Sequence, residues 1–540
     1  MSEVRDVVVI GSGHNGLVAA AYLARAGLSV EVLERNPVAG GAVASEELTE
    51  PGFVHDTFSS WHPLFKLSAA CAELGPELET HGLRYCETPE VTTANVRPDG
   101  SATIAYRDAV RTAEGLDAGD RDAYLAEMDS FGSTIPTVGQ LLGTELFSGQ
   151  AGQLSWRLAR VLGLRGGLRF TSDMLSSARA WFETRFASRE VSDLYAPWAL
   201  HTGLSPDESG SGFQGLAIAA SLHAVGLPVV HGGSGQFVVA FERLVGEHGG
   251  RITTGVEVER ILTRGGSATG VVAGGEEIRA RRAVIANTTP TQLYGRLLES
   301  RAAPPQAIRE AARFRYNARA GMQIHVALRE PLRWKDRRLN QVPMVHLSDG
   351  VVDVSLACAQ AAAGLLPARP TVVVGQPTTV DASRAPEGAA VLWIQLQQVP
   401  YAPAGDAAGE IDTASQTWTP EVEAAYTERV LSALEPHVEN WPAARGPHAA
   451  LSPVELERRN PNLVRGDIYS GDCGLGQSYL WRPLPSYGSH HTPVRDLYQC
   501  GASTYPGPGL NAASGRIVAL QIIAGDRPLG QVLRRVRAPR

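Results

Sequence analysis

The amino-terminal part of the chain alternates between short apolar runs and one longer apolar segment with helical spacing. Residues 7–10, VVVI, form a β-branched run that is long enough for a buried parallel strand. An alanine-rich segment then predicts a helix from about Asn15 to Ala26, which Gly27 ends. The stretch LSVEVLER alternates apolar and polar positions and predicts a second strand that closes at Glu34. The pattern therefore predicts a β-α-β unit.

A glycine-rich loop joins the first predicted strand to the helix. Gly11, Gly13 and Gly16 match G-x-G-x-x-G, whose glycines allow a tight turn, close approach to a pyrophosphate and close helix packing. Amide groups at the helix start, from Asn15 onward, would face the phosphates. Glu34 follows Gly16 by eighteen residues, where a strand-end carboxylate binds ribose hydroxyls and disfavours a 2′-phosphate. The unit predicts binding of FAD or NAD rather than NADP, and a purely structural unit is the alternative.

Two further segments favour FAD over NAD. The stretch RNPVAGGAVAS begins at Arg35 and places Gly40 and Gly41 in a turn where backbone can approach a ligand closely. A plain NAD-binding domain has no need of such a turn. Near the carboxyl end, a strand is predicted at 497–500, followed by a glycine-proline loop and a helix from about Asn511. The amino end of that helix can hold the electron-rich edge of a reduced flavin, with a dipole contribution of roughly 0.3–1 kcal/mol.

These motifs resemble those of one family. The double-glycine loop and the closing sequence LYQCGASTYPGPG resemble the FAD-dependent amine-oxidase and phytoene-desaturase superfamily, and most of all its phytoene-dehydrogenase-like oxidoreductases. Segments 50–65, 229–261 and 460–504 are similar to further stretches of that pattern, so the resemblance covers most of the chain. It implies an α/β fold with a Rossmann-type, glutathione-reductase-like FAD-binding domain and an inserted α+β substrate domain.

FAD is expected to bind without a covalent bond, because no histidine or cysteine lies in a motif for covalent attachment, and the resemblance implies which parts of the chain would hold it. Backbone around Val256 would contact the adenine end, and the closing loop would cradle the isoalloxazine ring. Pro508 departs from the family pattern because it has no amide proton to donate near the flavin. The motifs and the resemblance together give as cofactor-binding residues Gly11, Gly13, Asn15, Gly16, Glu34, Arg35, Gly40, Gly41, Val256, Gly501, Ala502, Gly507, Gly509, Leu510 and Asn511.

The FAD-binding domain is expected to be discontinuous. Segments 323–330 and 392–399 alternate apolar and polar positions, which predicts a half-buried antiparallel sheet over a pocket, and 361–389 is expected to be loop around one strand. In chain order, FAD-binding segments are predicted at 1–95, 226–295 and 490–540, a mainly helical substrate or cap segment at 96–225, and a sheet-bearing substrate segment at 296–489.

One basic segment stands out in the helical region. The stretch SWRLARVLGLRGGLRF, residues 155–170, places four arginines among Trp, Leu and Val. A basic amphipathic helix is typical of a membrane interface, where it can collect a lipid-soluble substrate. The alternative is a cap helix with solvated arginines, and Gly163, Gly166 and Gly167 weaken a continuous helix.

Composition narrows the class of protein further. A chain of 540 residues exceeds the usual limit for one hydrophobic core, and a formal charge of −7 with pI near 6.1 disfavours nucleic-acid binding. The five cysteines form no CxxC pair, which indicates a reducing compartment without disulfides. The start MSEVRDVVVIG shows no signal peptide or membrane-spanning run, so we expect a cytoplasmic protein, with peripheral membrane contact left open.

No protein-borne catalytic motif is evident. The chain lacks H-E-x-x-H and G-x-S-x-G, so we expect neither a metal site nor a serine hydrolase, and the cofactor would carry the reaction. Asp56, His62 and Tyr505 are the candidates for a group that removes a substrate proton, with His55 and His231 as further choices. Each of them has a purely structural role as its alternative.

The leading hypothesis is an FAD-dependent dehydrogenase that introduces or rearranges carbon–carbon double bonds in an apolar polyene, isoprenoid or lipid-like substrate. The first alternative is a flavin amine oxidase, and the second is a flavin-binding interaction protein without turnover. The chain has only two lysines, Lys66 and Lys335, and neither lies in a flavin motif, which slightly favours desaturation. The particular substrate, the number of double bonds formed, the terminal electron acceptor and the oligomeric state stay open.

Overall fold

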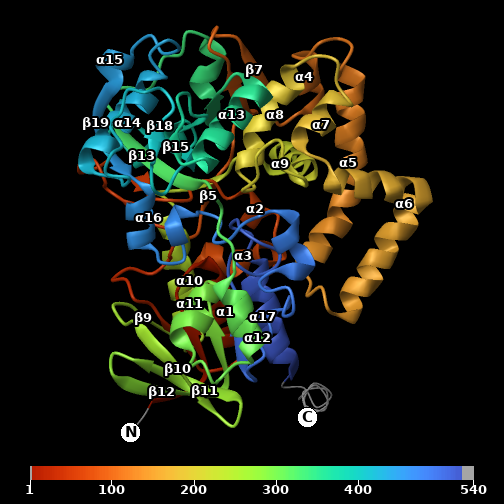
Figure 1. Ribbon diagram of the computed structural model, residues 1–540, viewed down its shortest axis with the longest axis vertical. Helices are drawn as coiled ribbons and strands as arrows, with labels where there is room; N and C mark the ends of the chain where they lie inside the picture. Colours follow the sequence, from red (N-terminus) through yellow and green to blue (C-terminus); the bar gives the residue numbers. More distant parts are fainter. Residues whose placement is uncertain (1–2, 526–540) are drawn as a thin grey trace.

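The computed structural model describes residues 3–525, apart from the side chain of Leu216, and shows two large β-sheets with helices packed around them (Figure 1). The first sheet has the strand order β10-β11-β12-β1-β2-β9, with β20 added beside β12. Its strands are β1 (Glu3–Ile10), β2 (Val30–Leu33), β9 (Arg251–Thr253), β10 (Val258–Arg264), β11 (Ser267–Ala273), β12 (Glu276–Ala286) and β20 (Leu497–Gln499). Strands β9, β2, β1, β12 and β20 run parallel, and β10 and β11 extend the sheet antiparallel beyond β12.

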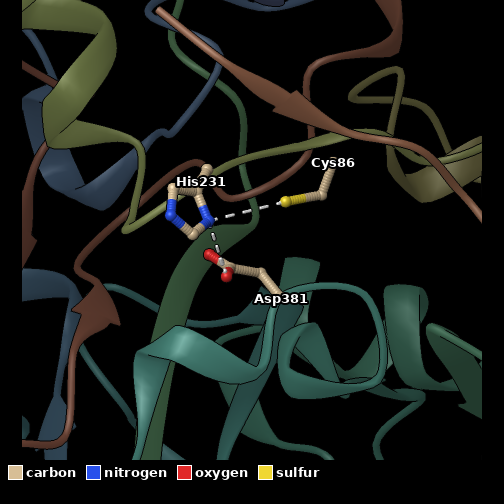
Figure 2. Close-up of side chains that lie close together, drawn as sticks. All are labelled: Cys86, His231 and Asp381. Atoms are coloured by element: carbon tan, nitrogen blue, oxygen red, sulfur yellow. Dashed lines mark hydrogen bonds and ion pairs between the residues drawn. The ribbon is translucent and has the colours of Figure 1, made fainter. Parts of the chain in front are cut away.

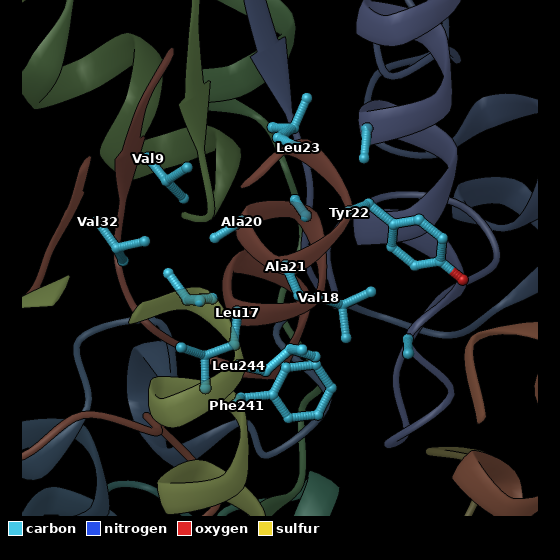
Figure 3. Close-up of a cluster of buried hydrophobic side chains, with 14 of the residues drawn as sticks. Val9, Leu17, Val18, Ala20, Ala21, Tyr22, Leu23, Val32, Phe241 and Leu244 are labelled. Carbon is cyan, nitrogen blue, oxygen red and sulfur yellow. The ribbon is translucent and has the colours of Figure 1, made fainter. Parts of the chain in front are cut away.

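The predicted amino-terminal β-α-β unit is confirmed, with β1 and β2 parallel and α1 between them. Helices α1 (His14–Arg25), α10 (Gly235–Glu247) and α17 (Ala513–Gly525) pack together on one face of the sheet, where the side chains of Leu17, Phe241 and Leu244 are completely buried (Figure 3). The opposite face is covered by a π-helical turn at Leu293–Leu297 and by α12 (Pro305–Ala312). Helices on both faces make this a three-layer α/β arrangement.

The second sheet has the order β19-β13-β17-β16-β14-β6-β7. All neighbouring strands are antiparallel except β14 and β6. The strands are β6 (Val91–Val96), β7 (Ala102–Tyr106), β13 (Ala320–Leu328), β14 (Met344–Leu347), β16 (Val372–Gly375), β17 (Ala390–Val399) and β19 (Arg445–Leu451). The domain boundary expected at residue 95 falls inside β6, which belongs to this second sheet; the other domain boundaries stay predictions.

The antiparallel pairing predicted for the second sheet is confirmed in β13 and β17, but the predicted half-burial is wrong. Every residue of β13 is buried, and nearly all of β17. One face packs on α14 (Pro420–Ser432), while the other meets the segment that follows β4 (His55–Asp56) and the helices around α8 (Glu190–Leu200). Both faces of the sheet are therefore covered, which explains why polar residues of the alternating pattern are also buried.

The segment predicted at 96–225 to be mainly helical carries most of its residues in helices (Figure 1). Its long helix α6 is broken at Gly163, whose φ of 61° and ψ of −175° are not helical, as the glycines in that segment led us to expect. Its helices are α4 (Ala109–Glu114), α5 (Arg121–Leu142), α6 (Gly149–Leu175), α7 (Ala178–Glu183), α8 (Glu190–Leu200) and α9 (Ser211–Val225).

The remaining elements connect or cover these regions. All five cysteines, which lie within the described residues, are free thiols. The short strands are β3 (Ser45–Glu46), β4, β5 (Tyr85–Cys86), β8 (Val229–Val230), β15 (Leu365–Leu366) and β18 (Gly405–Asp406), and the further α-helices are α2 (Pro63–Lys66), α3 (Ala69–Thr80), α11 (Pro290–Gln292), α13 (Gly350–Ala362), α15 (Trp441–Ala444) and α16 (Pro453–Arg459).

The packing of α1 on α10 generates a stability prediction. Leu244→Ala removes a fully buried side chain and leaves a cavity between the two helices, so we expect a loss of about 2–5 kcal/mol in the free energy of unfolding. The measurement is urea unfolding followed by circular dichroism. Val352→Ala, at an exposed position of α13, is the control and should cost less than about 0.5 kcal/mol. Equal losses in the two variants would contradict the packing argument.

Candidate functional site

A cavity of about 380 Å³ lies between the two sheets. Its walls come from the loop after β1, the ends of β2 and β12, the closing loop at 501–510, strands β13 and β17, and helix α9. In open parallel sheets, ligands bind at the carboxyl ends of the strands, and this cavity begins there. The volume lies in the range that buries a small ligand.

The glycine-rich loop forms the first wall as the motif predicts. Gly11 has a φ of 89°, a left-handed conformation that favours glycine. A Cβ at Gly16 would lie 2.3 Å from the carbonyl oxygen of Gly11, so only glycine lets α1 pack this closely. Gly13, His14 and Asn15 line the cavity at the start of α1, where free amide groups favour an anion. This cradle fits a dinucleotide pyrophosphate.

Glu34 also lines the cavity, immediately after β2. Its Oε2 accepts hydrogen bonds from the amide and the hydroxyl of Ser12, and its Oε1 accepts one from the amide of Asn36. A carboxylate has about four acceptor positions, two on each oxygen, so Oε2 is saturated and Oε1 retains capacity for a ribose hydroxyl. The carboxylate is thus held in place by the loop that it faces.

The double glycine lies in a closely packed turn, and its approach to a ligand stays a prediction. Gly40 donates its amide hydrogen to Ser12 Oγ, and a Cβ at Gly40 would lie 2.3 Å from the carbonyl oxygen of Val43. Gly41 lines the cavity, and a Cβ there would lie 3.1 Å from Cα of Gly13. The second turn is therefore packed directly against the first glycine-rich loop.

The closing loop completes the same end of the cavity. Gly501 has a φ of 112°, and a Cβ there would lie 2.7 Å from Oδ1 of Asn287. The Arg482 guanidinium, which is 1% exposed, donates from Nη2 to the Ala502 carbonyl at 2.8 Å and holds the loop. Asn511 Oδ1 accepts the amide hydrogen of Ala513 at the start of α17, which begins two residues later than expected.

The structure brings most of the predicted cofactor-binding residues to one cavity. Gly16, Gly40, Val256, Gly507 and Asn511 lie outside the lining, and Val256 donates its amide hydrogen to the Glu34 carbonyl. Flavin contact by individual residues stays a prediction. Those that line the cavity are Gly11, Gly13, Asn15, Glu34, Arg35, Gly41, Gly501, Ala502, Gly509 and Leu510.

Several lining residues escaped the sequence-based prediction. Asn287 follows β12 at the carboxyl edge of the parallel sheet, a place where its role could have been inferred from the predicted strand. The residues at the other end of the cavity carry no motif, because they come from separate elements that only the fold brings together. They include Trp61, Trp198, His201, Leu222 and Met344, whereas Gln323, Trp393 and Gln397 come from segments 323–330 and 392–399, which were predicted to cover a pocket.

Asp56, the first predicted catalytic residue, does not line the cavity. Its side chain is fully buried in an ion pair with Arg384, and it also accepts hydrogen bonds from Ser60 Oγ and from the amide of Ser234. Burial raises its pKa, but Arg384 and the neighbouring hydroxyls more than offset this and hold the pKa below the ordinary value. The carboxylate is thus saturated by structural contacts.

His62 and Tyr505 do not line the cavity either. His62 has both ring nitrogens occupied, by the Tyr85 hydroxyl at 3.0 Å and by Ser234 Oγ at 3.2 Å, and burial lowers its pKa to about 3. The Tyr505 hydroxyl donates to the Leu141 carbonyl at 2.8 Å, and burial raises its pKa. All three predicted catalytic residues are thus engaged in structural contacts, and a catalytic role for them stays a prediction.

A further polar cluster lies away from the cavity (Figure 2). Nδ1 of His231 is 3.9 Å from Sγ of Cys86 and 3.1 Å from Oδ1 of Asp381, so three side chains that could ligate a metal converge there. However, Asp381 already accepts hydrogen bonds from the Ser383 hydroxyl and the Gly232 amide, and burial raises the pKa of the Cys86 thiol. The cluster ties β5 to the turn that carries Asp381, and the expectation of no metal site stays a prediction.

The fold and this cavity are typical of a dinucleotide-binding protein, and comparison with known proteins identifies its family. A family model for flavin-containing amine oxidoreductases matches residues 16–504. The chain belongs to this family, and the predicted flavin cofactor and the Rossmann-type fold are confirmed. The protein is a flavin-dependent oxidoreductase.

Three curated relatives are similar along nearly their whole length. The chain is 26% identical to a rat pyridine nucleotide-disulfide oxidoreductase domain-containing protein 2, covering 95% of the chain and 92% of the relative. It is 28% identical to a limonene dehydrogenase subunit of Castellaniella defragrans, covering 98% and 96%. It is 27% identical to a zeta-carotene-forming phytoene desaturase of Myxococcus xanthus, covering 97% and 94%.

Solved structures share the fold. An oxidoreductase from Methanosarcina mazei has a TM-score of 0.61 at 18% identity, covering 95% of this chain and 99% of that one. A variant of putrescine oxidase has a TM-score of 0.60 at 17% identity, covering 97% and 100%. At these identities the likeness concerns the fold alone.

Glu34→Gln tests the adenosine end of the cavity. The amide keeps the shape of the side chain but removes the charge, so we expect FAD binding to weaken by about 1.5–3 kcal/mol while the fold is retained. Fluorescence titration of the apoprotein with FAD measures this. Glu31→Gln is the control, because Glu31 bonds Arg5 and Thr253 and lies outside the cavity lining. Unchanged FAD affinity in Glu34→Gln would show that Glu34 only supports the loop.

Arg384→Met tests the buried ion pair. The substitution leaves the Asp56 carboxylate buried without its cation, and we expect a loss of about 3–5 kcal/mol in the free energy of unfolding. Adding Asp56→Asn should recover some of this loss, because no unpaired charge then remains. The surface substitution Arg301→Met serves as control, since Arg301 is 87% exposed. If Arg384→Met is no more damaging than Arg301→Met, the pair does not stabilise the fold.

Proposed function

We propose that the protein is an FAD-dependent dehydrogenase that introduces or rearranges carbon–carbon double bonds in an apolar substrate, such as a polyene, an isoprenoid or a lipid-like chain. The observation that carries this proposal is the distribution of charge along the cavity. The charged side chains of the lining are Glu34, Arg35, Glu257 and Arg296, among the residues that the structure describes. All four belong to the nucleotide end, where Arg296 forms an ion pair with Glu257.

The other end of the cavity has apolar and neutral walls. Its lining includes three tryptophans, Trp61, Trp198 and Trp393, together with Leu222 and Met344. An ammonium group buried there would have no carboxylate to compensate its lost hydration, which costs several kcal/mol. A hydrocarbon loses no hydration and gains about 0.8 kcal/mol for each buried CH₂ group. The walls therefore favour an apolar substrate over an amine.

The names of two relatives support the same reaction class. The limonene dehydrogenase subunit and the zeta-carotene-forming phytoene desaturase are named for dehydrogenation of isoprenoid hydrocarbons, and their similarity extends over almost the whole chain. Flavin amine oxidase activity is the second candidate, favoured by the family description and by the fold likeness to putrescine oxidase.

One polar group in the substrate end has the position of a proton acceptor. His201 lines the cavity, and its Nε2 is 3.0 Å from Nε2 of His346. Burial lowers the pKa of His201 to about 3 and that of His346 well below its ordinary value, so both rings are neutral. A contact between two neutral imidazoles requires one nitrogen to carry the hydrogen.

The surroundings of His346 assign that hydrogen. Its Nε2 faces His201 and the backbone of Ala94 lies beside its ring, so we infer that Nδ1 carries the hydrogen. Nε2 of His346 is then the acceptor, and Nε2 of His201 is the donor. In this tautomer Nδ1 of His201 keeps a free lone pair, which is the acceptor that His201 offers to the cavity.

These groups suit dehydrogenation. A flavin held by the glycine-rich loops, Glu34 and the closing loop supplies an acceptor for the hydride of a substrate C–H bond. The chain orients the substrate between the tryptophans, keeps water out and removes a proton from the adjacent carbon at Nδ1 of His201. A carbon next to a developing cation is strongly acidic, so even a base with a low pKa suffices. That low pKa also keeps His201 unprotonated near neutral pH.

The reaction class is tested with FAD-loaded protein under anaerobic conditions. An isoprenoid polyene should bleach the oxidised flavin band and yield a product lighter by two hydrogens or a multiple of two. Putrescine should leave the band unchanged. Release of ammonia from an amine would instead establish the amine-oxidase alternative. If neither class nor any cell metabolite reduces the flavin, the protein is a binding module without turnover.

His201→Ala tests the proton acceptor. We expect kcat to fall about 10²–10⁴-fold, with unchanged FAD content, because proton removal loses its base. The pKa of His201 is about 3, so the ring stays unprotonated from neutral pH down to about pH 5. Protonation of His201 should therefore not lower the wild-type rate in this range. Thr202→Val, a neighbour outside the cavity lining, is the matched control. A rise in KM with kcat unchanged would show that His201 only positions the substrate.

A further inference from the structure

We propose that helix α6 is a docking surface for an anionic lipid bilayer. In Figure 1, α5 and α6 stand out to one side of the molecule, away from both sheets. The break at Gly163 divides α6 into two legs, and Leu164, the first residue of the second leg, is 81% exposed. Trp156, Val161 and Leu168 are also more than half exposed. Large apolar side chains in this number are unusual on a surface that faces only water.

The same surface carries positive charge without compensation. Arg157, Arg160 and Arg165 are exposed, and no acidic side chain among the described residues pairs with them. The sequence has no Asp or Glu from Gly149 to Ser172. Arg160 lies over the Trp156 ring, with its guanidinium carbon 4.7 Å from the ring centre. Arginine stems can then cover apolar surface while their charged ends reach lipid phosphates.

One side of α6 is buried against the protein, so only the opposite side can contact a bilayer. Ala151, Leu154 and Leu158 of the first leg are buried against the protein. Trp156, Arg157 and Arg160 line a shallow groove on the outside of that leg, together with Val161. An indole beside two guanidinium groups suits the boundary between lipid headgroups and acyl chains. Among the helices at residues 3–525, none combines the length and the apolar content that spanning a membrane requires.

A second copy of the chain fits this surface less well. Pairing two such surfaces would bring the arginine clusters of both copies together, and like charges at close range repel. An anionic bilayer offers negative charge and an apolar layer at the same place. The charge and the apolar side chains of α6 together therefore favour lipid.

Helix α6 packs on α9, a helix that forms part of the cavity wall. The second leg packs on α9, where the rings of Phe170 and Phe213 have centroids 5.4 Å apart. Ile218, Ser221 and Leu222 of the same helix α9 line the cavity. Lipid contact at α6 would thus hold one cavity wall close to the bilayer. The docking proposal itself rests on α6 alone and does not depend on the substrate proposed above.

Sedimentation with vesicles tests the docking surface on the FAD-loaded full chain. We expect binding to vesicles of phosphatidylcholine mixed with phosphatidylserine, weaker binding at high salt and little binding to pure phosphatidylcholine. Replacing Arg157, Arg160 and Arg165 together by Gln should lower the partition on the order of 100-fold. The control replaces Arg301, Arg309 and Arg313 by Gln, which changes the total charge equally but beside the flavin-binding sheet, and should bind like the wild type.

A second readout reports the depth of insertion. Brominated lipid should quench some of the tryptophan fluorescence of the wild type, and Trp156→Phe should lose that quenching while keeping its FAD. Leu164→Ser should weaken sedimentation without changing the circular dichroism spectrum, because the side chain is exposed. Three outcomes would overturn the proposal: no wild-type sedimentation with anionic vesicles, equal binding by the two arginine triples, or a dimer that only Leu164→Ser dissociates.

Discussion

The buried ion pair between Asp56 and Arg384 holds the two sheets of the protein in one arrangement. Both side chains are completely buried, and burying two charges costs several kcal/mol for each unless their remaining donors and acceptors are satisfied. Asp56 meets this condition by accepting hydrogen bonds from Ser45 and Ser60, and Arg384 by donating to the Val230 carbonyl. The pair therefore stabilises only the geometry in which all these groups meet, and that geometry defines the cavity.

The segment that follows Asp56 transmits this constraint to the substrate wall. The carbonyl of Phe58 accepts hydrogen bonds from the side chains of Gln323 on β13 and Trp393 on β17. The second sheet is thus positioned against a segment that the ion pair anchors to the first sheet. Because these polar contacts lie at the edge of the cavity, its substrate end can remain uncharged and still have rigid walls.

Sequence reasoning succeeded where a motif is local. The glycines at 11, 13 and 16, Glu34 and the first β-α-β unit lie within a short stretch, so spacing alone predicts their arrangement. His201 could not be found in this way, because its neighbour His346 comes from a distant strand of the second sheet. Asp56 was a catalytic candidate and lies in segment 50–65, which resembles the family pattern. The sequence does not reveal that Arg384, far away in the chain, forms an ion pair with it. The burial of both faces of β13 also depends on elements that pack from elsewhere in the chain.

The arrangement of charge along the cavity suits the apolar substrate that we propose, because such a substrate would meet no uncompensated ion there. Desolvation that disfavours charge in the substrate end also lowers the pKa of His201, so the same low dielectric that admits a hydrocarbon keeps the imidazole neutral. A carboxylate in that place would need a buried cation beside it, as Asp56 needs Arg384. Such an ion pair would bind water in the cavity, and this water would disfavour binding of an apolar ligand. In the proposed reaction a neutral histidine pair would accept the proton without this cost, so a cavity without charged walls at its substrate end would still allow proton removal.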